Sequence, residues 1–276
     1  MKMKKWGVLV LTLGLAAMLG LYGCSSASTE SADEGSADST ATTEEATYEL
    51  LTDGVLTVAT SPDYPPFENL EDGEYVGFDI DLAEAVGEKL GLEVEFVTLQ
   101  FDGIITAIAA GGQADMAISG MTVDAERAEQ IDFTDSYYID DLAVAAMEGS
   151  GVTSDTAADE LNQEGVIIAV QSGTSGETYC QENYPNATTQ AYGNSTDAFA
   201  AMQAGQADYV CTNYAVVENM LADAYSDAEI VLSVATGEEY AMVVSQDNPE
   251  LTAAINEALA ELEADGTIDE LLETWF

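Results

Sequence analysis

A repeated stretch constrains the fold of this chain more than any other feature of its sequence. Residues 105–118, Ile-Thr-Ala-Ile-Ala-Ala-Gly-Gly-Gln-Ala-Asp-Met-Ala-Ile, have a partner in residues 199–210, Phe-Ala-Ala-Met-Gln-Ala-Gly-Gln-Ala-Asp-Tyr-Val. Both stretches predict a helix, a glycine that ends it, a Gln-Ala-Asp turn and then a strand. The match predicts two α/β lobes of similar construction.

Strands and helices alternate around both copies, which favours the α/β class. Before and within the first copy we expect strands at 55–60, 75–78, 92–97 and 114–118, and helices at 79–90 and 102–110, with a proline-stiffened loop at 61–67. Around the second copy we expect strands at 166–170, 229–234 and 240–245, and helices after Gly176 and at 195–203 and 214–222. Asn248-Pro249 opens an amphipathic helix, and a short helix ends at Trp275-Phe276.

Two α/β lobes imply a cleft, and the strand-to-helix turns that face such a cleft are where ligands usually bind. Three turns have suggestive chemistry: the loop with Tyr64 and Phe67, the stretch Ser119 to Thr122, and the stretch Ser172 to Gly176. Glycines and hydroxyls at a helix start leave backbone N–H groups free to meet an anion. Each turn also has an ordinary interpretation, as aromatic packing or as a capped helix start. No lysine follows the last one, which excludes a nucleotide-hydrolase phosphate loop.

Arg127 is the single arginine of the 276 residues and, with Lys89, one of two cations after Cys24. Its planar fork can donate two parallel hydrogen bonds to one carboxylate. The alternative is a structural ion pair with a neighbouring acid such as Glu126, Glu129 or Asp132. The hydroxyl-bearing turn just before Arg127 favours a carboxylate clamp.

Acidic residues dominate the charge. All 52 lie after Cys24, and that part of the chain repels nucleic acid phosphates and anionic lipid headgroups, so we expect neither as a partner. The chain has no histidine, which removes the usual catalytic base and the commonest metal ligand. Acid pairs such as Asp79/Asp81 lack the spacing of a calcium loop. We expect a solvated acidic surface with no metal and no cofactor.

The N-terminus predicts export. Three lysines precede an apolar run over 8–21 that is short for a membrane-spanning helix, and the run ends in Leu21-Tyr22-Gly23-Cys24. This pattern resembles a bacterial lipoprotein signal, although Tyr22 is bulkier than the usual small residue; an ordinary secretory signal is the alternative. We expect a signal peptide over 1–23, a lipid on Cys24 at the extracellular face of the cell membrane, and a disordered acidic tether over 24–47.

Export also permits a disulfide between Cys180 and Cys211, but the apolar surroundings of Cys211 favour a buried free thiol.

Further motifs occur in a fixed order along the folded region. They are Tyr64-Pro65-Pro66-Phe67-Glu68, residues 76–83, 101–105, 115–122 and 126–138, Gly173-Thr174-Ser175, residues 208–213 and residues 265–275. In these motifs the chain resembles the family 3 extracellular solute-binding proteins, the polar amino acid receptors of ABC importers. The resemblance implies a type II periplasmic-binding fold, with lobe 1 at 48–138 and 238–276, lobe 2 at 141–237, and hinge crossovers at 139–140 and about 237–238.

The resemblance also implies a ligand site between the lobes. Arg127 would grip the α-carboxylate of an amino acid, with the Thr122 hydroxyl and the Ser175 N–H. The Gly120 carbonyl and Ser119 would accept bonds from the α-ammonium, while Tyr64 and Phe101 would flank the ligand side chain. Closure of the hinge on the ligand would then be recognised by the permease of the importer, with the protein acting as a monomer. The expected ligand-binding residues are Arg127, Thr122, Gly120, Ser119, Tyr64, Phe101, Ser61, Thr174, Ser175 and Asn213.

Two positions depart from the family pattern. Asn213 stands where many relatives have a carboxylate that pairs with the α-ammonium, and Ser61 stands where receptors for cationic amino acids often have an acid. The sequence therefore favours a neutral or polar ligand, although Asp63 keeps a cationic side chain open. The alternatives are a ligand-sensing domain for a signalling partner and a cyclohexadienyl dehydratase-like enzyme. We expect no enzymatic activity, because the sequence marks out no carboxylate to act as acid or base.

Overall fold

A mixed eight-stranded sheet forms the centre of the computed structural model, which describes residues 48–276. The predicted signal peptide, the lipidation site at Cys24 and the tether over 24–47 lie outside the described residues. The strand order is β5-β1-β6-β11-β7-β10-β8-β9. β1 (Val55–Thr60) lies parallel to β5 (Glu93–Thr98) and β6 (Met116–Ala117), and β8 (Ile167–Gln171) lies parallel to β9 (Thr188–Tyr192) and β10 (Tyr209–Asn213).

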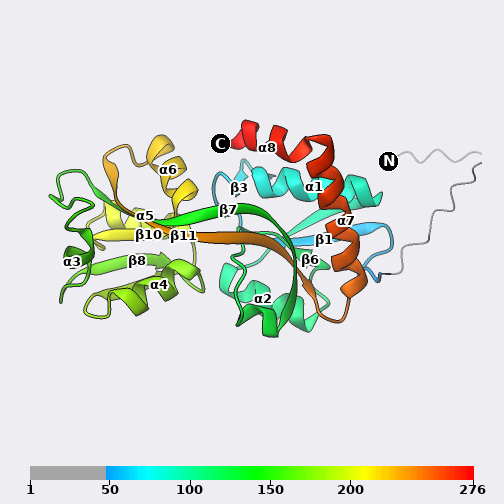
Figure 1. Ribbon diagram of the computed structural model, residues 1–276, viewed down its shortest axis with the longest axis horizontal. Helices are drawn as coiled ribbons and strands as arrows, with labels where there is room; N and C mark the ends of the chain where they lie inside the picture. Colours follow the sequence, from blue (N-terminus) through cyan, green and yellow to red (C-terminus); the bar gives the residue numbers. More distant parts are fainter. Residues whose placement is uncertain (1–47) are drawn as a thin grey trace, which may run out of the picture. The chain divides into compact units, whose positions relative to one another are not determined.

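Two long strands join these parallel groups. β7 (Ile131–Met147) and β11 (Ala228–Ser245) pair antiparallel with each other; β11 also pairs with β6, and β7 also pairs with β10. Figure 1 shows both strands running between the two groups of helices. Their register shifts between the pair Val234–Leu142 and the pair Glu238–Asp140. The crossovers predicted at 139–140 and 237–238 fall at this irregularity, and the lobe boundaries drawn there stay a prediction.

Each parallel group of strands, with the helices that pack on it, forms one of two lobes. The β1 lobe has α1 (Phe78–Leu90), α2 (Phe101–Ala110), α7 (Pro249–Asp265) and α8 (Thr267–Trp275), together with a small antiparallel sheet of β2 (Asp63–Tyr64), β3 (Glu68–Glu71) and β4 (Glu74–Val76). The β8 lobe has α3 (Ala157–Leu161), α4 (Ser175–Asn183), α5 (Ser195–Gln203) and α6 (Tyr214–Asp223). A single 3-10 turn, η1 (Arg127–Glu129), precedes β7.

Local sequence explains where several helices begin and end. α1 ends at Gly91, whose left-handed conformation favours glycine, and its N–H reaches back to Glu88. α7 begins with Pro249, which has no N–H to leave unpaired in the first turn, and ends at the left-handed Gly266. Along α1, Ile80, Leu82 and other apolar side chains are buried against the sheet, so the helix covers one of its faces.

Most of the predicted elements are confirmed, and so is the two-lobe α/β class. The strands predicted at 229–234 and 240–245 are a single strand, β11, because its ladder with β7 continues on both sides of the irregularity. The small sheet at β2 to β4 lies partly in the region predicted as a loop. Cys180 and Cys211 are both buried free thiols. Within residues 48–276, none of the helices is both long and apolar enough to span a membrane.

Candidate functional site

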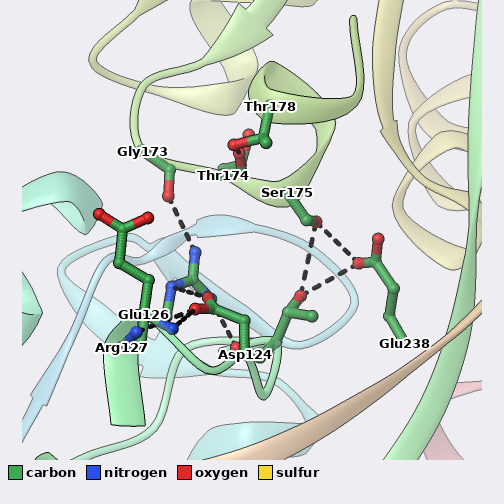
Figure 2. Close-up of polar contacts among 9 residues, drawn as sticks. Asp124, Glu126, Arg127, Gly173, Thr174, Ser175, Thr178 and Glu238 are labelled. Carbon is green, nitrogen blue, oxygen red and sulfur yellow. Dashed lines mark hydrogen bonds and ion pairs between the residues drawn. The ribbon is translucent and has the colours of Figure 1, made fainter. Parts of the chain in front are cut away.

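Arg127 lies between the lobes. It follows β6 at the start of η1, and its side chain is only 13% exposed. Nη1 donates to the Thr122 carbonyl at 2.6 Å, and Nη2 donates to the Gly173 carbonyl of the β8 lobe at 2.9 Å. Nε lies 3.0 Å from the Asp124 carboxylate. Figure 2 shows the guanidinium between Asp124 and Gly173. Burial lowers the pKa of Arg127 from its usual value, but the group stays charged at neutral pH.

The ring of Phe101 supports the same guanidinium from one side. Phe101 begins α2 and is buried, and the Arg127 Cζ lies 5.6 Å from its ring centroid, within the range of a cation–π interaction. The sequence suggested that Phe101 would flank the ligand side chain. In the structure the ring lies over the guanidinium of Arg127 itself and so limits the directions in which this group can point.

A carboxylate that the sequence did not single out lies beside Arg127. The Oε2 atom of Glu238 accepts a hydrogen bond from the Ser175 hydroxyl at 2.7 Å, as Figure 2 shows. The same oxygen accepts from the Thr122 hydroxyl and from the side-chain amide of Asn213, each at 3.0 Å. Thr122 belongs to the β1 lobe, whereas Ser175 and Asn213 belong to the β8 lobe. Glu238 therefore gathers three of the predicted site residues around one oxygen.

Glu238 is held there by the strand that carries it. The chain after β6 pairs with β11, since the Val123 N–H donates to the Glu239 carbonyl at 2.8 Å and the Ala241 N–H donates to the Met121 carbonyl at 3.1 Å. Thr122 and Tyr240 form a bridge in this pairing. The pairing places Thr122 next to Glu238, although they are 116 residues apart in sequence.

The start of α4 is capped by its own side chains. The Thr174 hydroxyl accepts a bond from the Glu177 N–H at 3.2 Å and donates to the Gln171 carbonyl at 2.8 Å, while the Glu177 carboxylate accepts from the Gly173 N–H at 2.8 Å. This reciprocal pattern resembles a capping box. The Thr174 hydroxyl is thus used within the helix start, whereas the Ser175 hydroxyl is directed across to Glu238 and Thr122.

The Ser119–Gly120 turn rests on two buried acids. The Ser119 hydroxyl donates to Glu68 Oε1 at 2.7 Å, and Asp79 Oδ2 accepts from the Gly120 N–H at 2.8 Å and the Tyr137 hydroxyl at 2.9 Å. Glu68 and Asp79 are fully buried, and their remaining oxygens have no partner if both acids are ionised. Burial raises the pKa of Asp79 to about 6 and raises that of Glu68 well above its usual value. We interpret these raised pKa values as one proton held between Glu68 and Asp79, which would give both of these oxygens a partner.

Tyr64 connects the lobes. It is buried, and its hydroxyl donates to the Asn213 Oδ1 at 2.6 Å and lies 2.8 Å from the Thr212 hydroxyl. The ring of Tyr64 and that of Tyr240 both pass close to Gly120, where an added Cβ would come within 3.3 Å of each. The Tyr240 hydroxyl is buried without a partner among the described residues. This leaves one polar group at the site that a bound ligand could satisfy.

Asp63 makes a second connection between the lobes. Its carboxylate accepts from the Ser61 hydroxyl at 3.0 Å, from the Gln171 amide at 3.4 Å and from the Ser195 N–H at the start of α5. Burial raises the pKa of Asp63. The Ser61 N–H in turn donates to the Ser119 hydroxyl at 3.1 Å. Ser61 therefore links Asp63 to the turn below the site.

The structure brings the predicted residues together from five separate segments, but in different roles. Three of them surround Glu238, and Arg127 lies next to them. Ser119, Ser61 and Thr174 have hydroxyls that hold other parts of the protein, and the Arg127 ion pair is with Asp124 rather than with any of the three acids suggested from sequence.

Sequence reasoning missed Glu238, Asp124 and the pair of Glu68 and Asp79. Glu238 adjoined the predicted crossover, but nothing distinguished it from Glu239. In the described part of the chain, acidic and cysteine side chains form no cluster that could hold a metal ion.

Comparisons with known proteins identify a family of similar sequences and structures. The sequence model of the bacterial extracellular solute-binding proteins, family 3, matches residues 56–276. The ABC transporter arginine-binding protein 1 of Escherichia coli is 33% identical over 226 residues, covering 78% of this chain and 88% of that protein. A solved ancestral arginine-binding protein bound to glutamine is 36% identical, with a TM-score of 0.75 over 82% of this chain and 99% of the other. An ancestral amino acid-binding protein described as a precursor of cyclohexadienyl dehydratase is 35% identical, with a TM-score of 0.73 over 81% and 95%.

Proposed function

The chain belongs to the bacterial extracellular solute-binding proteins of family 3, and from that premise we propose that it is the substrate-binding component of an amino acid ABC importer. The ligand binds between the two lobes, and Arg127 clamps its α-carboxylate. The ligand stabilises the closed arrangement because residues of both lobes contact it, and the permease recognises that arrangement.

The observation that carries this proposal is the state of the Arg127 guanidinium. Of its five N–H groups, three are directed to Asp124, Thr122 and Gly173, which leaves one on each terminal nitrogen. Two N–H groups of one fork are what a carboxylate needs for a bidentate bond. The N–H of Ser175 at the tip of α4 and the positive end of the helix dipole support the same anion.

For the ligand side chain we propose a neutral or polar group. Ser61 carries no charge, and both oxygens of Asp63 already accept hydrogen bonds, from Ser61, Gln171 and Ser195. The solved relative described as bound to glutamine is in keeping with a polar ligand. A second candidate is a cationic amino acid, because Asp63 is the acid nearest to Ser61 and because the Escherichia coli relative is named for arginine.

Isothermal titration against the twenty common L-amino acids tests the function, and the pair L-glutamine and L-arginine tests the side chain. We expect one or a few tight ligands, with glutamine or another uncharged amino acid bound more tightly than arginine. Tighter binding of arginine would select the second candidate. An absence of binding across the set would refute the proposed function.

The protein acts as a binding protein at the outer face of the membrane, anchored by a lipid on Cys24. Substitution Cys24→Ser is expected to move it from the membrane fraction into the soluble one. Its permease partner should be recovered by immunoprecipitation from membranes, whereas recovery of a signalling protein would favour a sensory role.

We expect no enzymatic activity. One similar solved structure is described as a precursor of cyclohexadienyl dehydratase, so turnover of prephenate is the reaction to measure. Detectable turnover would contradict the assignment as a non-enzyme.

A further inference from the structure

We propose that the Glu238 carboxylate receives the α-ammonium of the bound amino acid and that Asn213 holds Glu238 in position for it. This assignment rests on the proposed function. It concerns the end of the ligand opposite Arg127, where Asn213 provides no charge. It also implies that the ligand must carry a free amino group as well as a carboxylate.

The first argument is the charge balance of the site. The Arg127 guanidinium already has an anionic partner, because its Nε lies 3.0 Å from Asp124. The three groups that hold Glu238 are two hydroxyls and an amide, all neutral. Glu238 is half-buried between the lobes and has no cation within 4.0 Å in the described part of the chain. The Arg127 guanidinium is near enough to interact with the Glu238 charge but does not pair with it directly. A partly buried carboxylate without a directly paired cation is costly, and a ligand ammonium would supply that partner.

The second argument is the geometry of the carboxylate. All three hydrogen bonds end on Oε2, and Oε1 has no hydrogen-bond partner within residues 48–276. Oε1 therefore remains available as an acceptor. An ammonium group donates up to three hydrogen bonds and needs acceptors of this kind. The Tyr240 hydroxyl, buried and without a partner, lies close enough to Glu238 for its negative charge to raise the Tyr240 pKa further, although burial is the larger cause.

The third argument is the position of Glu238 relative to the clamp. No guanidinium nitrogen lies within 4.0 Å of the Glu238 oxygens, so Glu238 does not take the place of a carboxylate on the Arg127 fork. Both groups are nevertheless bound by one residue: the Thr122 carbonyl accepts from Arg127, and the Thr122 hydroxyl donates to Glu238. The Arg127 cation and the Glu238 anion therefore lie on either side of Thr122. This arrangement suits an α-amino acid, whose carboxylate and ammonium groups are bonded to the same carbon.

The orientation of Asn213 is fixed by its neighbours. Its Oδ1 accepts from the Tyr64 hydroxyl at 2.6 Å, so its amide nitrogen is directed to Glu238 at 3.0 Å. An aspartate at 213 would place a second carboxylate beside Glu238, and the two like charges would repel each other. The site therefore has one acid and one amide, and the two can in principle be exchanged.

The experiment uses the full folded chain and two kinds of probe. The probes are the twenty common L-amino acids and the α-deaminated analogue of the strongest binder, each titrated by calorimetry. Substitution Glu238→Gln keeps the shape and an acceptor oxygen but removes the charge. We expect it to weaken amino acid binding at least about tenfold and to change binding of the deaminated analogue less than about twofold, because only the amino acid brings a cation. The matched control, Glu239→Gln, removes one charge from the adjacent exposed position of the same strand.

A second variant separates the charge from the structural role of Glu238. In the double variant Asn213→Asp with Glu238→Gln, the acid and the amide are exchanged, and we expect most of the lost affinity to return. Unchanged affinity in Glu238→Gln would overturn the inference and leave the proposed function intact. An equal loss for the amino acid and its analogue would also overturn it and would show that Glu238 only joins the lobes. Tighter binding in Glu238→Gln would mean that Glu238 competes with the ligand carboxylate. Failure of the wild type to bind any probe would refute the proposed function itself.

Discussion

At the scale of single residues, the site depends on the shape of its charged groups as much as on their sign. Arg127 satisfies Asp124 and two carbonyls and still has two N–H groups for a ligand. A lysine has three N–H groups in all on a flexible stem, so it could hold the same neighbours only by losing the bonds to the ligand. The proposed clamp therefore requires arginine.

Substitution Arg127→Lys is expected to weaken ligand binding by at least about tenfold, which corresponds to about 1.4 kcal/mol, while the melting temperature changes little. Titration calorimetry measures the affinity, and circular dichroism measures the melting. The reverse exchange, Lys89→Arg, is the control, because Lys89 pairs with Asp265 at 2.7 Å far from the cleft. Equal affinity in Arg127→Lys and wild type would refute the clamp.

A second prediction at this scale concerns the proton shared by Glu68 and Asp79. The folded protein raises the pKa of both acids, so it holds protons that the unfolded chain releases near pH 4. Stability from these groups is full below that pH and is lost as the pH rises through the folded pKa values, which for Asp79 is about 6. Each such proton lowers the free energy of unfolding by about 1.4 kcal/mol per pH unit within this window.

Substitution Glu68→Gln is expected to remove part of this loss, because an amide can donate to Asp79 at every pH and still accept from Ser119. Denaturant unfolding from pH 4 to pH 8 should show wild type losing stability relative to the variant as the pH rises. Glu71→Gln, at an exposed position of the same strand, removes a charge without a buried proton and should follow wild type. Parallel pH curves for wild type and Glu68→Gln would contradict the shared proton.

At the scale of elements, the cleft depends on how closely α2 approaches the start of α4. Gly173 has a positive φ of +78°, and a Cβ added there would lie 2.9 Å from the Cβ of Asp102 in α2. The same residue gives its carbonyl to Arg127. The turn before α4 thus needs glycine for its backbone and for contact between the lobes.

Substitution Gly173→Ala is expected to oppose closure and to weaken ligand binding by about tenfold or more, because the new methyl group meets α2 only when the lobes are together. Gly149→Ala is the matched control: Gly149 also has a positive φ, of +84°, but nothing lies within 4 Å of an added Cβ. Both variants are expected to lose about 1 kcal/mol of stability from backbone strain. Only the first should lose affinity in calorimetry, and equal affinities in the two variants would contradict the closure argument.

At the scale of the whole molecule, the large excess of negative charge is a destabilising term that sets this chain apart from an ordinary globular protein. After Cys24 only Lys89 and Arg127 oppose 52 acids, and both cations are engaged in ion pairs, Lys89 with Asp265 and Glu261 and Arg127 with Asp124. Repulsion among the remaining carboxylates destabilises the compact state, and dissolved salt screens it.

Raising NaCl from 10 mM to 1 M is therefore expected to raise the melting temperature by several degrees, or about 1 kcal/mol or more. Scanning calorimetry measures the shift. Tetramethylammonium chloride at the same ionic strength should give a similar shift, since screening does not depend on the identity of the cation. A melting temperature that stayed constant or fell with salt would contradict this account.

The sequence predicted much of the fold because many of its signals are local. The repeat around residues 105–118 and 199–210 indicated two α/β lobes, and glycines at 91 and 266 marked the ends of α1 and α7. The single arginine drew attention to Arg127, which bonds to residues of both lobes. The continuous pairing of β7 and β11 was not predicted, since it joins segments nearly a hundred residues apart and leaves no local pattern.

The chemistry around Arg127 was decided by the tertiary structure. In the sequence Glu238 and Glu239 are equivalent neighbours, yet only Glu238 lies among Thr122, Ser175 and Asn213. Likewise, Glu68 and Asp79 have raised pKa values because folding buries both of them under the same turn. The sequence by itself indicated two lobes and singled out Arg127 as the proposed anion-binding residue, because periodicity and composition can be read along the chain. Which carboxylate faces the other end of the ligand depends on the contact between distant segments, and only the folded chain creates that contact.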